Sequence, residues 1–463
     1  AWVAVLVGAT ELDIGVAWLG LAIGKGVRTI RNGNGLRPTK WLGVLAEPMG
    51  QLALGFVFVQ LVARPLIRLT PDWLHWLGWI AAVAVLAILL RVVPMVVRHI
   101  WTTRGRWRLR ASIARLTNHE WWPSWAYYGP LVPWFVWLSV RHRHPLVFTA
   151  CNPGIAHGGG LAGESKSDIL NGLLASGDDR VLYGERLPDG GSAADRAAWL
   201  MQRLAEEPRL GGLPIVMKPD AGEQGRGIKV CRSAEDVGRY LRGAPGPVMV
   251  QKLSTRPGEV GVFFVRDGEN RGRVFSINRK LFPVLTGDGR RTLEELIWRH
   301  PRYRCQADLF LARFADRRND VLGEGETLVL SWAGNHAQGT EFRDAPELIT
   351  PGLEDAVRAI ADGFAGEGGG GLDFGRFDLR FDDDESLARG AFDVIEVNGV
   401  TSESANIYDP GRSMWFAWRT LARQWSIAYA TGARRAAEGH RPLGVAEAWR
   451  MARSHVRERR SLG

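Results

Sequence analysis

Apolar residues dominate the first part of the chain in long runs. Residues 73–90 contain no Asp, Glu, Lys or Arg, and residues 41–63 are interrupted by Glu47 and Pro48. A run of about 20 apolar residues is long enough to cross the hydrocarbon core of a bilayer. The pattern therefore predicts a transmembrane hairpin from these two runs, and residues 1–23 are a third, weaker candidate span.

Basic residues flank the predicted hairpin on both sides. They cluster in residues 25–40 and again in residues 98–110. Because positively charged segments beside a span stay in the cytoplasm, both clusters are expected there. The expected location is thus the inner membrane, with the rest of the chain in the cytoplasm. A cytoplasmic protein, in which the apolar runs form a buried helical hairpin, is the alternative.

An aromatic segment, residues 120–140, follows and is interrupted by prolines. Its tryptophans, with Arg and His residues beside them, are typical of a segment that lies in a membrane interface or re-enters it. The net charge of +10 favours an acidic partner. Since most tryptophans lie beside the apolar runs, we expect that partner to be a membrane and expect no nucleic acid. A Trp-rich soluble core is the alternative.

From about residue 147, short runs of alternating apolar and polar residues, which are typical of strands, occur between helical stretches. This texture predicts an α+β class with antiparallel strand pairs. Three regions follow: a helical region at 1–146, a catalytic domain at 147–430 and a basic helical tail at 431–463. Within the catalytic domain, Thr292 and Glu295 are spaced as a capping box that begins a helix.

One glycine-rich stretch, VMKPDAGEQGRGIKV at residues 216–230, lies between two strand-like runs. Lys218 ends the first run and can place a positive charge on a phosphate. Gly222, Gly225 and Gly227 allow the backbone N–H groups to approach an anion closely. The stretch therefore indicates a phosphate-binding loop, and an ordinary hairpin is the alternative.

Two further strand-like runs, residues 376–381 and 392–399, carry oxygen ligands. Asp378 lies in the first run, and Glu396 and Asn398 lie two residues apart in the second. Residues two apart on a strand share a face. If the strands pair, these oxygens converge in a set that suits Mg²⁺. A surface hairpin is the alternative, but it explains poorly why Glu396 and Asn398 alternate with apolar residues.

The order of these motifs resembles the ATP-grasp superfamily, and most closely the D-alanine–D-alanine ligase-like branch of carboxylate–amine ligases. The resemblance covers residues 147–430. It implies two α+β subdomains that clamp ATP between antiparallel sheets. The apolar N-terminal region stands where that family has its usual first subdomain.

The resemblance also implies roles for individual residues. Arg376 and Lys218 would act on the transferred phosphoryl group, and Asp378, Glu396 and Asn398 would hold one or two Mg²⁺ ions, with Mn²⁺ as an alternative. The implied ATP contacts are Lys166, Lys218, Gly222, Gly225, Gly227, the adenine-binding hinge at Gln251, Lys252 and Leu253, and Glu259 at the ribose. Gln251 departs from the family, which usually has an acid at this position.

Polar residues in the connecting loops are candidates for substrate binding. They are Asn152, His157, Arg279, Lys280, Asn335, His336, Glu403 and Ser404. For each histidine, a structural hydrogen bond is the alternative.

The function expected from these features is a Mg²⁺-dependent ligase that uses ATP to join a carboxylate to an amine through an acyl phosphate. An ATP-grasp kinase that phosphorylates a small-molecule hydroxyl is one alternative, and a non-catalytic nucleotide-binding membrane protein is another. The acid, the amine and the oligomeric state are not predicted.

Overall fold

The computed structural model describes residues 102–161, 164–220, 227–244, 246–266, 271–366, 369–451 and 453. The chain forms two compact units, residues 1–112 and 113–463. Helix α6 (Thr103–Thr117) crosses this division. The predicted spans at 1–23, 41–63 and 73–90 lie outside the described residues. Within the described residues, no helix is both long enough and apolar enough to span a membrane.

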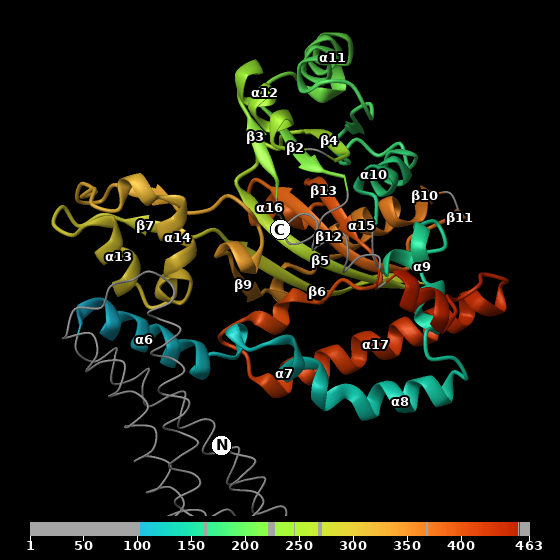
Figure 1. Ribbon diagram of the computed structural model, residues 1–463. Coiled ribbons are helices and arrows are strands. Elements are labelled where there is room, and N and C mark those ends of the chain that lie inside the picture. The colour runs from blue at the N-terminus through green and yellow to red at the C-terminus, as the bar shows by residue number, and fades with distance from the viewer. Residues whose placement is uncertain are drawn as a thin grey trace, which may run out of the picture. The chain divides into compact units, whose positions relative to one another are not determined.

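A five-stranded sheet is the centre of the second unit (Figure 1). All its pairings are antiparallel, in the order β13–β12–β5–β6–β9. The strands are β5 (Gly258–Arg266), β6 (Gly272–Leu281), β9 (Glu341–Asp344), β12 (Phe374–Phe381) and β13 (Asp393–Asn398). The α+β class predicted for this part of the chain is therefore confirmed.

Apolar side chains cover both faces of this sheet because its strands alternate. On one face, residues such as Val262 and Phe377 pack in a core with the apolar sides of two helices, α10 (Lys166–Leu174) and α15 (Pro351–Gly363). On the other face, Phe263 and Phe374 pack in a second core with the long helix α17 (Met414–Ala437). The second core fills only part of its face, and the rest carries charged residues.

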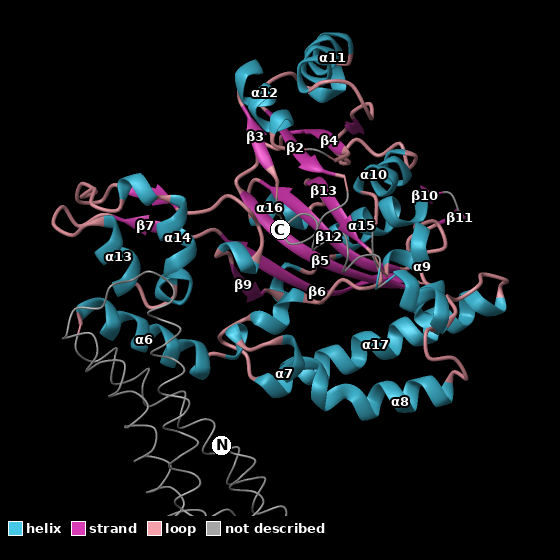
Figure 2. Ribbon diagram, in the orientation of Figure 1, coloured by secondary structure: helices cyan, strands magenta, loops and turns pink. Residues whose placement is uncertain are grey.

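A four-stranded antiparallel sheet, in the order β1–β4–β2–β3, forms a second layer. Its strands are β1 (Gly184–Arg186), β2 (Ile215–Pro219), β3 (Lys229–Cys231) and β4 (Val248–Lys252). Helices α11 (Ala193–Glu206) and α12 (Ala234–Arg242) pack against it in a core of its own (Figure 2).

Smaller elements complete the unit. Between β6 and β9 lie β7 (Val284–Thr286), β8 (Thr327–Val329), α13 (Leu293–Arg299) and α14 (Ala307–Arg313). Elsewhere are α9 (Ala156–Gly160), α16 (Asp384–Ala388), β10 (Ala365–Gly366) and β11 (Gly369–Gly370). Thr292 caps α13 and forms a capping box with Glu295, so that prediction is confirmed.

The aromatic segment forms short helices that pack on α17. It contains η3 (His119–Trp121), α7 (Ser124–Tyr128), η4 (Gly129–Leu131) and α8 (Val132–Arg141), and η5 (Val147–Ala150) follows. Leu131 and Leu138 face the core shared with α17. The outward side of α8 is also apolar, because Val136, Trp137 and Val140 are exposed.

Candidate active site

Charged residues occupy one face of the five-stranded sheet because of its register. Asp378 on β12 lies directly opposite Glu396 on β13, and Arg376 lies opposite Asn398. Directly opposed residues of an antiparallel pair project to the same face. The two strands therefore bring the predicted metal ligands and Arg376 together on one side of the sheet.

Buried ion pairs connect this face across three strands. Lys280 Nζ on β6 lies 2.8 Å from Glu259 Oε1 on β5 and 2.9 Å from Asp378 Oδ2 on β12. Arg380 Nε lies 2.8 Å from the other oxygen of Glu259, and Arg376 Nε lies 3.2 Å from Asp378 Oδ1. Each buried carboxylate thus faces two cations, which offsets the loss of water around it.

These charges set the protonation of the buried groups. Burial alone would raise the pKa of Asp378, but Lys280 and Arg376 outweigh it and hold that pKa below its ordinary value. Burial would lower the pKa of Lys280, but Asp378 and Glu259 raise it above the ordinary value for lysine. Both groups are therefore charged at neutral pH.

Glu396 is unlike the other acids on this face. Within the described part of the chain, its carboxylate makes no hydrogen bond and no ion pair. Its neighbour Asn398 has a buried amide nitrogen, Nδ2, without a partner. Because the two ends of an amide are assigned from their surroundings, a rotated Asn398 would present its oxygen at the same place.

The donor set fits Mg²⁺. Two carboxylates and one amide oxygen leave room for the water and phosphate oxygens that Mg²⁺ keeps as ligands. The free carboxylate of Glu396 and the unpartnered amide of Asn398 support this fit. Within the described residues, no group of three or more His, Cys, Asp or Glu side chains is placed to hold a metal ion. The proposed set contains two carboxylates and one amide, so the remaining ligands of Mg²⁺ would be water and substrate oxygens.

Lys218 approaches the charged face from the four-stranded sheet. It is only 5% exposed at the end of β2. Its Nζ donates to Gln251 Oε1 at 2.9 Å and to the Ile395 carbonyl of β13 at 3.5 Å. Burial, with help from the charge of Lys166, lowers the pKa of Lys218, while Glu396 opposes that shift. A phosphate beside Lys218 would supply the negative charge that it lacks.

The helix α10 brings Lys166 to the same region. The Lys166 N–H donates to the Asp220 carbonyl at 3.0 Å, just after β2. The Asp220 carboxylate receives the Ser167 N–H at 2.8 Å. The start of α10 is thus fastened to the end of the strand that carries Lys218.

Part of the predicted glycine loop is outside the described residues, including Gly222 and Gly225. Gly227 has a φ of +75°, and a Cβ there would lie 2.8 Å from Pro219 Cγ. Only glycine fits this position without strain.

The predicted nucleotide contacts differ in their surroundings. Gln251 is buried on β4, where it accepts from Lys218 and donates to the Leu182 carbonyl at 3.1 Å. Lys252 is exposed, and Leu253 follows β4 and is half-buried. Glu259 already binds a cation at each oxygen, so in this structure it belongs to the ion-pair network.

The candidate substrate residues separate into two groups. Lys280, His336, Glu403 and Ser404 lie on or beside the charged face. Asn335 instead caps η9 (His336–Gln338), and Arg279 projects to the other face of β6, where it pairs with Asp384 on α16. The side chain of His157 is outside the described residues.

Asn152 has a structural role. It is fully buried, with a φ of +54°. Its amide nitrogen donates to the carbonyls of Gly159 and Phe374, and its oxygen accepts from the N–H groups of Asp373 and Phe374. These bonds satisfy the backbone at the start of β12 and leave the amide committed to it.

Several residues of the site were missed from the sequence. Arg380 lies two residues after Asp378, so strand alternation alone would have placed it on the charged face. Tyr128, Tyr408 and Gln424 gave no such signal, because they reach the site from separate helices. Glu164 was also missed; one of its oxygens accepts the Gly399 N–H at 3.3 Å, next to Asn398.

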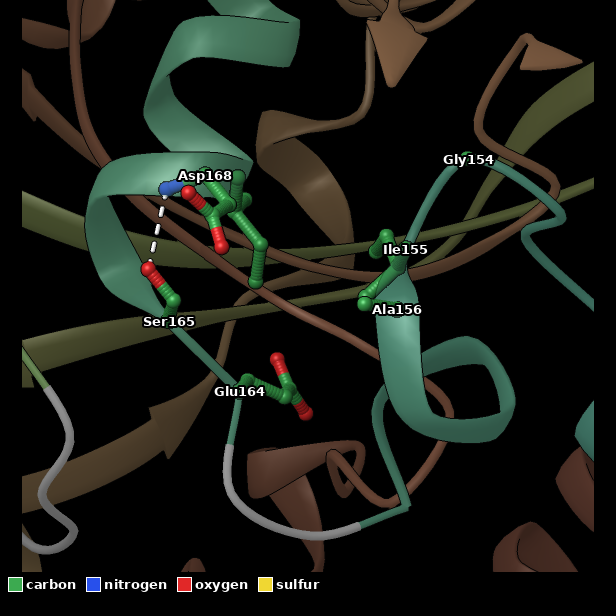
Figure 3. Close-up of a pocket in the computed structure, with 7 residues that line it drawn as sticks. Gly154, Ile155, Ala156, Glu164, Ser165 and Asp168 are labelled. Carbon is green, nitrogen blue, oxygen red and sulfur yellow. Dashed lines mark hydrogen bonds between the residues drawn. The ribbon is translucent and has the colours of Figure 1, made fainter. Parts of the chain in front are cut away.

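A small cavity of about 20 Å³ adjoins Glu164. It is lined by residues 154–156, which lead into α9, and by four residues at the start of α10, namely Glu164, Ser165, Asp168 and Ile169. Figure 3 shows the Glu164 side chain between α9 and Ser165, which caps α10. The volume suits about one water molecule, so this cavity is not a substrate pocket.

No protein-family model and no curated protein sequence matches the chain. Solved structures similar to it include a bifunctional glutathione synthetase from Pasteurella multocida, with 16% identity and a TM-score of 0.31 over 56% of this chain and 36% of that one. Another is the ATP-grasp ligase PsnB complexed with minimal precursor, with 15% identity and a TM-score of 0.28 over 56% and 60%.

A third similar structure is the D-alanine–D-alanine ligase from Coxiella burnetii, with 12% identity and a TM-score of 0.30 over 59% of this chain and 58% of that one. In each of these three cases the match spans less than two thirds of the other protein's length. At such TM-scores and identities, the likeness does not by itself establish the fold or the activity.

Proposed function

We propose that the chain is an ATP-dependent ligase of the ATP-grasp type, which joins a carboxylate to an amine. The observation that carries the proposal is the arrangement of Asp378, Glu396 and Asn398 on one sheet face, opposite the buried Lys218 of the second sheet. Two antiparallel sheets with oxygen ligands on one and lysine on the other suit a polyphosphate bound between them.

The residues of the site would act mainly by position and charge. Arg376, Lys218 and Lys166 would offset the negative charge of the phosphates and of the carboxylate that attacks them. Asp378, Glu396 and Asn398 would hold Mg²⁺, which when bound supplies further charge neutralisation. Gly222, Gly225 and Gly227 would supply backbone N–H groups to the phosphates.

The proposed reaction has two steps. A carboxylate oxygen attacks the γ-phosphorus of ATP, and the bond to the ADP oxygen breaks to give ADP and an acyl phosphate. The amine then attacks the carbonyl carbon, and the C–O bond breaks with its electron pair leaving on phosphate. Of the three protons of the ammonium, one remains in the amide, one leaves with hydrogen phosphate and one goes to solvent.

Product analysis tests this reaction. The full chain is incubated with MgATP and a panel of carboxylates, and hydroxylamine is added as a nucleophile that converts an acyl phosphate to a hydroxamate. We expect ADP, phosphate and hydroxamate in equal amounts. A phosphorylated hydroxyl compound would identify a kinase instead, and the absence of ADP with every acid would contradict turnover.

For location, we propose that the chain acts at the cytoplasmic surface of a membrane. The support within the described residues is α8, whose outward side chains are apolar and whose end carries Arg141 and Arg143. Tryptophan beside arginine suits the headgroup region of an anionic bilayer. The membrane hairpin at 41–63 and 73–90 remains part of this proposal.

A fluorescent label tests the position of α8. The native cysteines are buried, so Trp137→Cys can be labelled selectively with an environment-sensitive dye. We expect a blue shift of its emission in bilayers that contain phosphatidylglycerol. The matched control is Ala205→Cys on α11, which lies at the opposite end of the unit from α8 (Figure 1). Equal emission from both positions would contradict the proposal.

A further inference from the structure

The loop after Asn398 holds Glu403 in a fixed position beside the charged face. Its two neighbours are fastened to one side chain, Gln424 of α17, which is fully buried. The Ser404 N–H donates to Gln424 Oε1 at 2.9 Å, and Gln424 Nε2 donates to the Ser402 carbonyl at 3.0 Å. The backbone on either side of Glu403 therefore has little freedom.

Further hydrogen bonds tie the same loop to the sheet. The hydroxyls of Ser404 and Ser276 of β6 are hydrogen-bonded to each other, and Ser404 Oγ donates to Asn406 Oδ1 at 2.7 Å. Asn406 Nδ2 donates to Asp344 of β9 at 2.9 Å. A loop attached to both a helix and two strands is a rigid support for a side chain that binds a ligand.

Two tyrosines hold the Glu403 carboxylate itself. The hydroxyl of Tyr128, from α7, donates to one oxygen, and the hydroxyl of Tyr408 donates to the other at 2.6 Å. Burial, and then the charge of Glu403, raise the pKa of both tyrosines above its ordinary value. Both phenols therefore remain neutral donors, and neither adds a charge to balance Glu403.

Glu403 is close to Arg376 but does not form an ion pair. Arg376 Nη1 donates to the Glu403 backbone carbonyl at 3.3 Å, and the charge of Glu403 contributes to the raised pKa of Arg376, against the effect of burial. Among the described residues, the Glu403 carboxylate has hydroxyl partners and no cationic partner within ion-pair distance. Asp378 and Glu259, by contrast, each contact two cations.

We propose that Glu403, with Tyr128 and Tyr408, binds the positively charged amino group of the amine substrate. This inference rests on the proposed ligase function and adds that the amine substrate is a cation. A half-buried carboxylate without a cation attracts an ammonium group and repels the carboxylate substrate. Glu403 thus favours the amine over the carboxylate substrate at its position beside Arg376.

The rings around Glu403 suit the same ligand. The Tyr408 ring stacks on His336, with centroids 5.5 Å apart, and lies 5.2 Å from the ring of Tyr127. Aromatic faces beside a carboxylate stabilise an ammonium group through cation–π contacts. The substrate class that fits is a primary amine that is protonated at neutral pH.

The purely structural alternative is that Glu403 only anchors the two tyrosines. The two roles predict different kinetics, because an anchor would affect every nucleophile alike. Hydroxylamine is uncharged at neutral pH and does not need a carboxylate partner. Cationic amines need a carboxylate partner. The amines to be compared are ethylamine, ethanolamine, 1,4-diaminobutane and a set of amino acids.

The experiment compares these nucleophiles in the full chain and in Glu403→Gln, with the acid that gives hydroxamate. Glutamine keeps the shape and one of the two oxygens that accept from the tyrosines, and it removes the charge. We expect the KM for the cationic amine to rise about 10- to 100-fold more than the KM for hydroxylamine or ATP. Tyr128→Phe should show the same selectivity with a smaller effect.

The outcomes separate this inference from the proposed function. If the wild-type chain forms no hydroxamate with any acid, the ligase function fails and this inference fails with it. If hydroxamate forms but Glu403→Gln weakens all nucleophiles equally, or if no cationic amine is used, the ligase stands and the ammonium site is overturned. Thermal melting of Glu403→Gln identifies a variant that is merely unfolded, and Glu403→Asp then repeats the comparison with the charge retained.

Discussion

Replacing Glu396 by glutamine is expected to reduce ATP turnover by at least about 100-fold, since even the groups that orient a metal ligand account for 10- to 100-fold. Glu396 is the one acid of the Asp378, Glu396 and Asn398 set whose carboxylate is not already bound by cations. Removing its charge should therefore weaken Mg²⁺ binding directly. Initial rates measured against Mg²⁺ concentration would show a lower maximum and a higher half-saturating concentration.

The same substitution should leave the fold intact. The Glu396 carboxylate makes no hydrogen bond or ion pair within the described residues, so glutamine leaves no partner unsatisfied. Glu347→Gln, the same change at an exposed carboxylate, is the matched control. A variant with wild-type turnover and an unchanged Mg²⁺ dependence would refute the metal role of Glu396.

Replacing Lys280 by methionine is expected to destabilise the chain by about 3 kcal/mol, the lower end of the cost of breaking a buried ion pair, because each carboxylate keeps a second cation. Lys280 is in contact with both Glu259 and Asp378, and its side chain is only 2% exposed. The variant would leave Glu259 with Arg380 alone and Asp378 with Arg376 alone, so that each buried carboxylate has one oxygen without its cation. Urea denaturation followed by circular dichroism would measure the loss of unfolding free energy.

The neighbouring residue provides the control. Arg279→Met removes an equally charged side chain from the same strand, but Arg279 faces the other side and pairs with an exposed Asp384. Surface ion pairs contribute at most about 1 kcal/mol. Adding Glu259→Gln to Lys280→Met should recover part of the lost stability, because it removes a buried charge that has lost one of its two cations. Equal losses for Lys280→Met and Arg279→Met would contradict a buried network.

Some charged residues of this face stabilise the sheet, and others are proposed to bind ligands. Glu259, Lys280 and Arg380 form ion pairs with one another and are given no part in the proposed reaction. Glu396 and Glu403, which lack a cationic partner among the described residues, are the groups proposed to bind ligands. We infer that the ion pairs hold the strands in register, while Glu396 and Glu403 supply carboxylates that are free to bind a metal ion and an ammonium group, beside the paired Asp378 and Arg376.

Some of this arrangement could be predicted from local sequence. The alternation in residues 376–381 predicted a strand with Asp378 on the side opposite Phe377, and the structure has Asp378 on the charged face and Phe377 in the core. The capping box of Thr292 could also be predicted from the sequence. Both depend on interactions within a few residues, where side-chain chemistry and backbone geometry are enough.

Other residues were assigned to the wrong environment because their partners are distant in sequence. Asn152 looked like a ligand in a glycine-rich loop, but its amide satisfies backbone groups more than 200 positions away, at Asp373 and Phe374. Arg279 and Lys280 are adjacent and looked equivalent, but alternation on β6 puts them on opposite faces. Which face of β6 is charged depends on the side chains that the neighbouring strands place beside it.

The sequence by itself determined the strands, the helix cap and the kinds of ligand that residues 376–398 could offer, because strand periodicity and capping are local. Only the tertiary structure decided that Lys218 reaches the same place from another sheet, and that Tyr128 and Gln424 fix Glu403. Those contacts join segments whose pairing depends on the packing of two cores around one sheet. No short stretch of sequence contains that information.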